Sequence, residues 1–257
     1  MELENLLYTV KDHVAVITLN RPPVNAQNRR IREELMSLFD GFGDDDEVRC
    51  IVLTGSGKVF SAGADIKERG GIREAKGEFN RHNRVVREFF YSIMECPKPV
   101  VCAVNGAALG AGFVLATVCD VVLASENATF GMPEVDVGIA GGTKFMLRWF
   151  GQSKARMLMF SGQRLPAAEL YRLGAIEACV PPEQLMPRAM EIAHTIAAKS
   201  PLATRGLKES FQMVEATALR EAYRLEQNVT VALAKTEDSK EAQRAFLEKR
   251  KPVFRGR

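Results

Sequence analysis

A glycine-rich stretch between two apolar segments constrains this chain more than any other feature. Asn105–Gly112 reads Asn-Gly-Ala-Ala-Leu-Gly-Ala-Gly, with the apolar runs 99–104 before it and 113–118 after it. This order predicts a buried strand, a bend and a helix. Glycine and alanine leave the backbone of the bend accessible, and the first N–H groups of the helix would face outward from it. The stretch therefore predicts a site for a phosphate, a carboxylate or a developing oxyanion.

Composition narrows the class of protein. The 257 residues are 46% hydrophobic, enough for a substantial core, and the formal net charge of +3 with mixed signs does not favour nucleic acid as a partner. The five cysteines form no CxxC pair, and most lie in apolar runs, so we expect them to be reduced. The acidic N-terminus resembles no signal peptide, and no apolar run approaches the roughly 20 residues that span a bilayer. We therefore expect a cytoplasmic protein without a membrane segment.

Strand and helix patterns alternate in the first half of the chain, and helices follow. Residues 55–82 hold six glycines and many charges, which is typical of a mobile loop beside a site. Apolar runs predict strands over 6–10, 14–19, 50–54, 99–104, 121–124 and 128–130. Helical spacing predicts helices over 29–42, 85–94, 143–150, 152–160, 166–172, 184–198, 201–213 and 216–248, the last broken at least once. The pattern predicts an α/β core followed by a helical extension.

Three kinds of site compete for the glycine-rich bend. A dinucleotide fold requires G-x-G-x-x-G, but Leu115 stands where the third glycine belongs. The Gly-Lys-Ser/Thr of a P-loop is absent. The remaining interpretation is an oxyanion hole made of backbone N–H groups, which needs a second donor elsewhere in the chain. The small-residue loop 60–65, directly after a predicted buried strand, is the candidate for that donor.

Several motifs together resemble one family. Phe-Ser-Ala-Gly-Ala-Asp-Ile-Lys (60–67), the bend 105–112, Cys119-Asp120 and Phe-Gly-Met-Pro-Glu (130–134) occur in the order and spacing of the enoyl-CoA hydratase/isomerase (crotonase) superfamily. The resemblance covers nearly the whole chain and also includes residues 18–22 and 246–252. It implies a crotonase-like spiral of ββα repeats, with two roughly perpendicular sheets and a helical shell, over residues 1–198. It also implies a C-terminal helical region, 199–257, that forms a homotrimer or a dimer of trimers.

The resemblance implies an acyl-CoA substrate and assigns the residues that contact it. The thioester carbonyl would lie between the backbone N–H groups of Ala62 and Ala111, which stabilise an enolate more than the ground state. Glu134 would be the general acid and base. Coenzyme A is part of the substrate, so no separate cofactor and no metal are expected. The expected contacts with the substrate or its CoA portion are Val24, Ala62, Gly63, Ala64, Asp65, Ile66 and Gly110.

One position departs from the hydratase pattern. Hydratases of the family hold a water with two glutamates, and the first of them falls on Val114 here. A valine can neither orient water nor deliver a proton. A single glutamate is the pattern of some Δ3,Δ2-enoyl-CoA isomerases, so double-bond isomerisation in fatty acid metabolism is the leading hypothesis. Two alternatives stay open. One is hydration of a 2-enoyl-CoA (a lyase reaction) with Asp136 or another assisting acid, and the other is a catalytically weak acyl-CoA- or RNA-binding protein.

Overall fold

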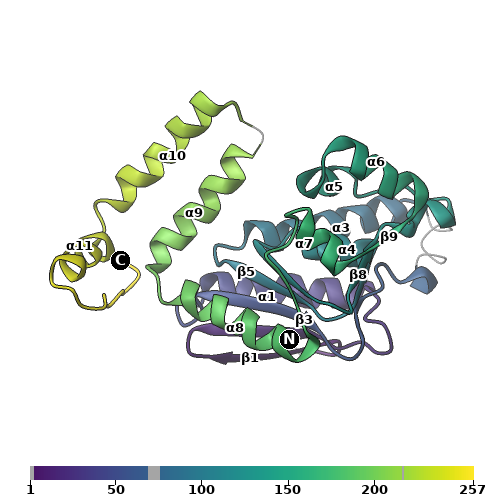
Figure 1. The fold of residues 1–257 in the computed structure, drawn as a ribbon, viewed down its shortest axis with the longest axis horizontal. Coiled ribbons are helices and arrows are strands. Elements are labelled where there is room, and N and C mark those ends of the chain that lie inside the picture. Colours follow the sequence, from purple (N-terminus) through teal and green to yellow (C-terminus); the bar gives the residue numbers. More distant parts are fainter. Residues whose placement is uncertain (1–2, 69–75, 216) are drawn as a thin grey trace.

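A computed structural model describes residues 3–68, 76–215 and 217–257 and confirms the predicted α/β class. Two sheets form the core, and helices surround them (Figure 1). The larger sheet has the order β1-β2-β3-β5-β7-β10 and the smaller has the order β4-β6-β8-β9. The strands are β1 (Leu6–Lys11), β2 (Val14–Leu19), β3 (Cys50–Gly55), β4 (Val59–Ser61), β5 (Val100–Val104), β6 (Ala107–Leu109), β7 (Val121–Ser125), β8 (Thr129–Gly131), β9 (Arg164–Pro166) and β10 (Ala178–Val180).

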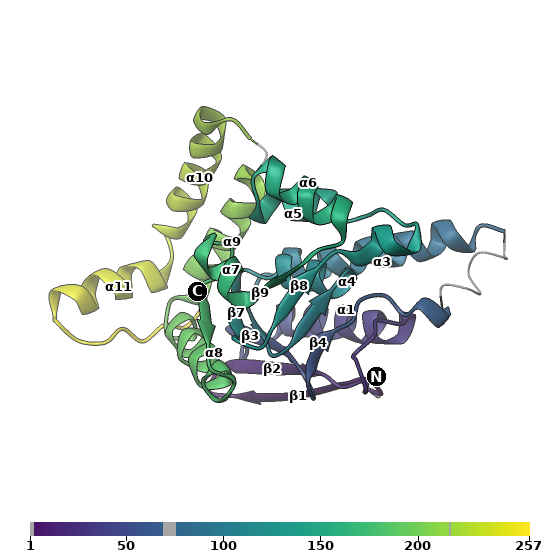
Figure 2. The ribbon, with the colours of Figure 1, turned by 45° about the vertical axis from the view of Figure 1, so that its right-hand side comes forward.

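The helices lie in two groups, one around the sheets and one at the C-terminal end of the chain (Figure 2). Around the sheets are α1 (Arg29–Asp44), α3 (Glu78–Glu95), α4 (Ala111–Thr117), the 3-10 helix η1 (Pro133–Val137), α5 (Thr143–Trp149), α6 (Gln152–Ser161), α7 (Ala167–Arg172) and α8 (Pro182–Ala197). At the end of the chain are α9 (Pro201–Val214), α10 (Leu219–Leu233) and α11 (Glu237–Leu247). None of the described helices is both long and apolar enough to cross a membrane.

Successive strands alternate between the two sheets. β3, β5 and β7 lie parallel in the larger sheet, and each is followed by a strand of the smaller sheet: β4, β6 and β8. Those three strands are also neighbours and parallel. A helix follows each pair, namely α3, α4 and η1 within the described residues. The chain is therefore a spiral of ββα units, as the resemblance predicted.

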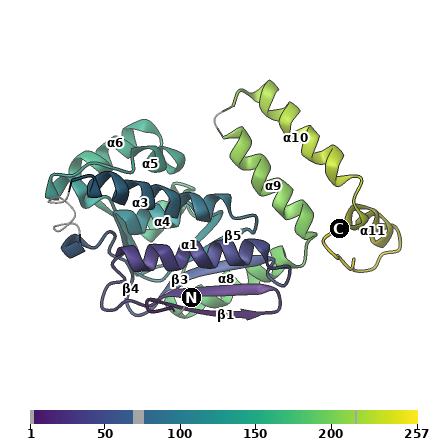
Figure 3. The ribbon, with the colours of Figure 1, turned by 180° about the vertical axis from the view of Figure 1, so that it is seen from behind.

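The central strands of the larger sheet, β3 and β5, are buried on both faces. On β3, Cys50 and Val52 pack against α8, whereas Ile51 and Leu53 face the main core. On that second side α1 and α3 lie next to each other (Figure 3). Because both faces of the strand are covered, its sequence reads as a continuous apolar run rather than an alternating one.

The helices predicted after Thr143 are present, but two short strands between them, β9 and β10, were not predicted. β9 pairs antiparallel with β8, and β10 pairs parallel with β7. The glycine-rich bend also contains a strand, β6. Each of these strands is three residues long, too short for a period of two to be distinguished in the sequence. The predicted helix 216–248 is broken, as expected, and Thr236 caps the second part by accepting a hydrogen bond from the Ser239 N–H (3.1 Å).

The helices at the C-terminal end extend away from the sheets. α9 and α10 run antiparallel beside each other, and α11 lies near the base of α9 (Figures 1 and 2). Several of their apolar side chains are exposed in the single chain, including Phe211, Phe246 and Leu247. The predicted boundary between residues 198 and 199 falls just before α9.

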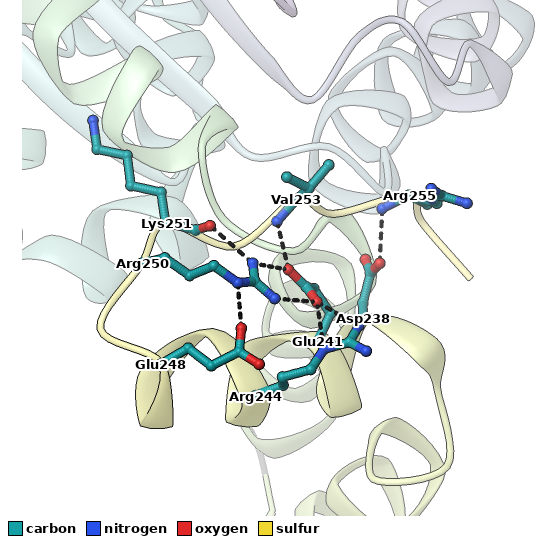
Figure 4. Close-up of polar contacts among 8 residues, drawn as sticks. All are labelled: Asp238, Glu241, Arg244, Glu248, Arg250, Lys251, Val253 and Arg255. Carbon is teal, nitrogen blue, oxygen red and sulfur yellow. Dashed lines mark hydrogen bonds and ion pairs between the residues drawn. The ribbon is translucent and has the colours of Figure 1, made fainter.

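Residues after α11 fold back onto that helix (Figure 4). The Glu241 carboxylate accepts hydrogen bonds from Arg244, Arg250 and the Val253 N–H, and the two arginines lower its pKa. Asp238, which is 2% exposed, accepts hydrogen bonds from the backbone N–H groups of the tail. These donors are Arg255 (2.8 Å) and Gly256 (3.1 Å). The two carboxylates therefore attach the tail to α11.

We predict that Asp238→Ala releases this tail. The substitution leaves two backbone donors and the Ser200 hydroxyl without their acceptor, which costs about 1–3 kcal/mol when such groups stay buried. Hydrogen exchange of the Arg255 and Gly256 amides should become faster in the variant. Glu237→Ala is the matched control, because its exposed pair with Arg257 contributes little. Unchanged exchange in Asp238→Ala would contradict the assigned role.

Candidate active site

Two neighbouring cavities, here called outer and inner, share part of their lining. The outer cavity, of about 500 Å³, is lined by Ala62, Gly63, Ala64, Ile66, Gly110, Pro133, Glu134, Asp136, Val137 and Ile139. The inner cavity, of about 410 Å³, lies between α3, α4 and the residues that follow η1. Ala64, Glu134 and Ile139 line both cavities. The junction therefore combines a carboxylate with the loop that follows β4.

Most of the predicted site residues line these cavities. Ala111 and Val114 line the inner cavity. The outer cavity is lined by Ala62, Gly63, Ala64, Ile66, Gly110, Glu134 and Asp136. Two of the predicted residues line neither cavity. The exceptions are Val24 and Asp65, which are not among the described lining residues of either cavity.

Asp65 holds the loop instead. Its carboxylate accepts a hydrogen bond from Arg21 at 2.7 Å. Partial burial acts to raise the pKa of Asp65, but the hydrogen bonds from Arg21 and from the backbone N–H groups of Lys67 and Glu68 lower it on balance. Asp65 is thus a charged anchor between the loop after β4 and the segment after β2.

The loop after β4 touches the N-terminus of α4 directly. A Cβ added at Gly63 would lie 2.6 Å from the Leu109 carbonyl oxygen and 3.2 Å from the Ala111 nitrogen. A Cβ added at Gly112 would collide with the carbonyl oxygen of Ser61. Only glycine permits two backbones to approach this closely. The contact brings two sets of backbone N–H groups to one place.

The Ala111 N–H points out of the N-terminus of α4, toward its contact with the loop after β4. The helix begins at Ala111, and the Gly110 carbonyl accepts the Val114 N–H at 3.0 Å. The peptide bond between Gly110 and Ala111 is planar and trans, so the Ala111 N–H points opposite to that carbonyl. It is one of the N-terminal donors that a helix cannot satisfy internally. This geometry is what an oxyanion donor requires.

The structure contradicts the prediction that Ala62 supplies the second donor. The Ala62 N–H already donates to the Val24 carbonyl oxygen at 2.9 Å. Further along the loop, the Gly63 carbonyl and the Asp65 N–H both bond to the backbone of Gln27. The intervening Ala64 N–H therefore points away from Gln27, as in any parallel bridge, and Ala64 lines both cavities. Ala64 rather than Ala62 therefore has an N–H group that the backbone of Val24 and Gln27 does not engage.

Glu134 is placed beside the same backbone. It lies in η1, directly after β8, and its Oε1 would be 2.5 Å from a Cβ added at Gly110. Gly110 has a φ of +53°, in the left-handed region that L side chains rarely adopt. A glycine at this position lets the carboxylate approach the residue that precedes the Ala111 donor.

Part of the lining of the inner cavity is apolar. Val114 is 4% exposed and lines the inner cavity together with Met132 and Phe145. The exposed Asp136 lines the outer cavity only, among the described residues, and its carboxylate lies against Gly162. The structure therefore does not bring Asp136 to the position that Val114 occupies.

Apart from Glu134, the sequence predicted no polar residue of the inner cavity, yet its lining also includes Arg32, His82, Asn83, Arg87 and Tyr91. Arg32 is 1% exposed and donates from Nη2 to the Gln27 carbonyl at 2.7 Å. The sequence signal for it was a basic residue beside the apolar stripe of α1, next to Ile31. His82, Val86 and Phe90 form one row of α3 at a spacing of four residues along this cavity. Within the described residues, no three His, Cys, Asp or Glu side chains cluster as metal ligands would.

Comparisons with known proteins identify the family and the fold. The family model for "Enoyl-CoA hydratase/isomerase" matches residues 9–257. A putative enoyl-CoA hydratase/isomerase of Bacillus subtilis is 36% identical over 98% of this chain and 99% of its own length. A short-chain-enoyl-CoA hydratase of Clostridium acetobutylicum is 37% identical over 98% and 97%. The crystal structure of an enoyl-CoA hydratase from Bacillus anthracis superposes with a TM-score of 0.93 at 33% identity, covering 99% of this chain and all of that one.

We predict that Gly110→Ala disturbs both the backbone and the Glu134 carboxylate. The new methyl group would collide with Oε1 of Glu134, and the φ of +53° is strained for alanine. We expect a loss of about 1–3 kcal/mol in unfolding free energy, measured by urea denaturation with the fluorescence of Trp149, the single tryptophan. Gly141→Ala is the matched control, because Gly141 lines the neighbouring inner cavity and has open space around it. Equal stability of the two variants would contradict the prediction.

Proposed function

The chain belongs to the enoyl-CoA hydratase/isomerase family, and we propose on that basis that it shifts a double bond in an acyl-CoA thioester. The proposal depends most on one observation, namely that Glu134 is the carboxylate at the junction while Val114 faces the inner cavity without any proton to give. The substrate would be a 3-enoyl-CoA and the product a 2-enoyl-CoA.

The thioester oxygen would lie between the N–H groups of Ala64 and Ala111. Both N–H groups point toward the junction, as their peptide planes require. Negative charge develops on this oxygen as a proton leaves C2, so donors fixed in advance lower the barrier. The outer cavity beside loop 62–66 would take the CoA portion, and the inner cavity would take the acyl chain.

One carboxylate suffices for the proton transfers. Glu134 removes a proton from C2, and the electrons of that C–H bond form a dienolate that extends from the thioester oxygen to C4. The protonated Glu134 then returns the proton to C4, which leaves the double bond between C2 and C3. The step is redox-neutral, so the proposal includes no cofactor beyond the CoA of the substrate.

Hydration of a 2-enoyl-CoA is the second candidate. It is favoured by the names of the relatives, since the protein of Clostridium acetobutylicum is a hydratase. Addition of water to C3 requires a group that holds the water in addition to Glu134. Among the described residues, the apolar Val114 faces the place where such a group would stand, and Asp136 lines only the outer cavity. These positions support isomerisation over hydration.

We also propose that the C-terminal region, residues 199–257, assembles the chain into a homotrimer or a dimer of trimers. The support is the exposure of large apolar side chains on its helices, where Phe211 is 73% and Phe246 is 83% exposed in the single chain. Sedimentation equilibrium would measure the assembled mass directly. A monomer at micromolar concentration would refute this part of the proposal.

Glu134→Gln tests the assigned base. The amide cannot accept a proton from C2, so we expect kcat for a 3-enoyl-CoA to fall by at least about 100-fold. Binding of a saturated acyl-CoA, measured by calorimetry, should change little because the side chain keeps its size. Asp136→Asn is the matched control and should retain most activity. Turnover that survives Glu134→Gln would exclude this mechanism.

Val114→Glu tests why one reaction is favoured. If Val114 faces the reacting carbons, a carboxyl group there can hold a water, and we expect the ratio of hydratase to isomerase activity to rise by about 10-fold or more. The two activities are measured on a 2-enoyl-CoA and a 3-enoyl-CoA. Val114→Gln has a similar size but no acid, so it should not raise the ratio. A folded Val114→Glu variant with an unchanged ratio would show that this position does not determine the reaction.

A further inference from the structure

A buried glutamine connects the two backbone donors. Gln27 is fully buried and lies between the loop after β4 and the N-terminus of α4. Its backbone N–H donates to the Gly63 carbonyl at 2.7 Å, and its carbonyl accepts the Asp65 N–H at 3.1 Å. Its side-chain Nε2 donates to the Ala111 carbonyl at 3.1 Å. One residue thus contacts both halves of the proposed oxyanion hole.

The backbone contact determines the direction of the first donor. The Gly63 carbonyl and the Ala64 N–H belong to the same peptide group, which is planar and trans. When Gln27 holds that carbonyl, the Ala64 N–H is directed to the opposite side, toward the cavities. The Asp65 contact holds the next peptide group in the same way. A rotation of this loop would misdirect the donor.

The side-chain contact determines where the second donor lies relative to the first. Gln27 Nε2 reaches the Ala111 carbonyl and also the Ser61 hydroxyl, at 3.3 Å. Ser61 Oγ in turn accepts the Gly63 N–H (3.3 Å) and donates to the Asn25 carbonyl (2.8 Å). The side-chain amide of Gln27 therefore connects α4 to the loop after β4. The backbone of Gln27 holds the peptide planes of that same loop.

Packing alone does not explain an amide at this position. Gln27 Oε1 is buried, and the described part of the chain offers it no hydrogen-bond partner. An apolar side chain of similar size would fill the space without an unsatisfied oxygen, which is unfavourable in a protein interior. Arg32 holds the residue in place by donating to its carbonyl. Among the described residues, the amide forms two hydrogen bonds, from Nε2 to the Ala111 carbonyl and to the Ser61 hydroxyl.

We propose that Gln27 is a positioning residue that sets the spacing and direction of the Ala64 and Ala111 N–H groups for a thioester enolate. It does not touch the substrate and acts through these two residues. The inference rests on the proposed function, because it assumes that the oxygen between the donors becomes negatively charged. Loss of the Nε2 contact should then weaken binding of an enolate more than binding of a neutral thioester.

Gln27→Met tests this inference, because methionine is of similar length and cannot donate. We expect kcat to fall by about 10-fold, less than the 100-fold typical for removal of a whole donor, with KM changed by less than about twofold. Binding is measured with two probes that need no turnover, a saturated acyl-CoA and a 3-ketoacyl-CoA whose enolate absorbs in the ultraviolet. The saturated probe should bind as before, and the enolate fraction of the bound 3-ketoacyl-CoA should fall at fixed pH.

Thr54→Val is the matched control. It removes another buried hydrogen bond, from Thr54 Oγ1 to the Ala103 carbonyl (2.8 Å), at a distance from the donors along the larger sheet. Its enolate fraction should equal that of the parent protein even if its melting temperature falls. An unchanged enolate fraction in Gln27→Met, or an equal loss of both probes, would overturn the inference.

Gln27→Glu gives a second readout if the methionine variant folds poorly. The introduced carboxyl group can donate while protonated, but as a carboxylate it faces the Ala111 carbonyl and repels it. Relative to the parent protein, the enolate fraction should be kept at low pH and lost as pH rises through the pKa of that group. A ratio that does not depend on pH would contradict the inference. Activity in Glu134→Gln refutes the proposed base without affecting these binding measurements, so the two failures are distinguishable.

Discussion

The site depends on one backbone contact, between the loop after β4 and the first residues of α4. The smaller sheet creates it, because β4 and β6 are parallel neighbours and their carboxyl ends lie at the same edge. The chain leaves β4 at Ser61 and β6 at Leu109, and Gly63 and Gly112 then permit the two segments to touch. Any side chain at these glycines would separate the Ala64 and Ala111 N–H groups by the width of a methyl group or more.

The smaller sheet also positions Glu134, the proposed base. β8 is the next parallel neighbour of β6, and the chain leaves it at Gly131, three residues before Glu134. Three neighbouring strands of one sheet are therefore followed, at a single edge, by the two proposed donors and the proposed base. The Gly110 N–H donates to the Gly131 carbonyl at 2.8 Å, so the base and the Ala111 donor are held by adjacent backbone. Rigid strands are suited to this task because a displacement of a fraction of an ångström in such an arrangement costs catalytic efficiency.

Much of this arrangement was predictable from the sequence, and the errors have physical causes. The long apolar runs of β3, β5 and β7 identified the buried sheet, and the motifs identified the family and pointed to Glu134 and Ala111, which both line the cavities. The three-residue strands β6, β9 and β10 were missed because they carry no measurable period. The choice of Ala62 over Ala64 was wrong because the direction of an N–H depends on peptide planes. Those planes are held by Val24 and Gln27, more than thirty residues away along the chain.

The position of Val114 links the fold to the chemistry. It lies one turn into α4, whose first residue is the Ala111 donor, so its side chain is held as firmly as the donor itself. A buried apolar group at this place offers no hydrogen bond to a water molecule. A dienolate bound between the donors would therefore have the protonated Glu134 beside it and an apolar wall behind it. This is the physical basis of the proposed isomerisation: donors at the thioester oxygen would stabilise the charge, and Val114 would hold no water at C3.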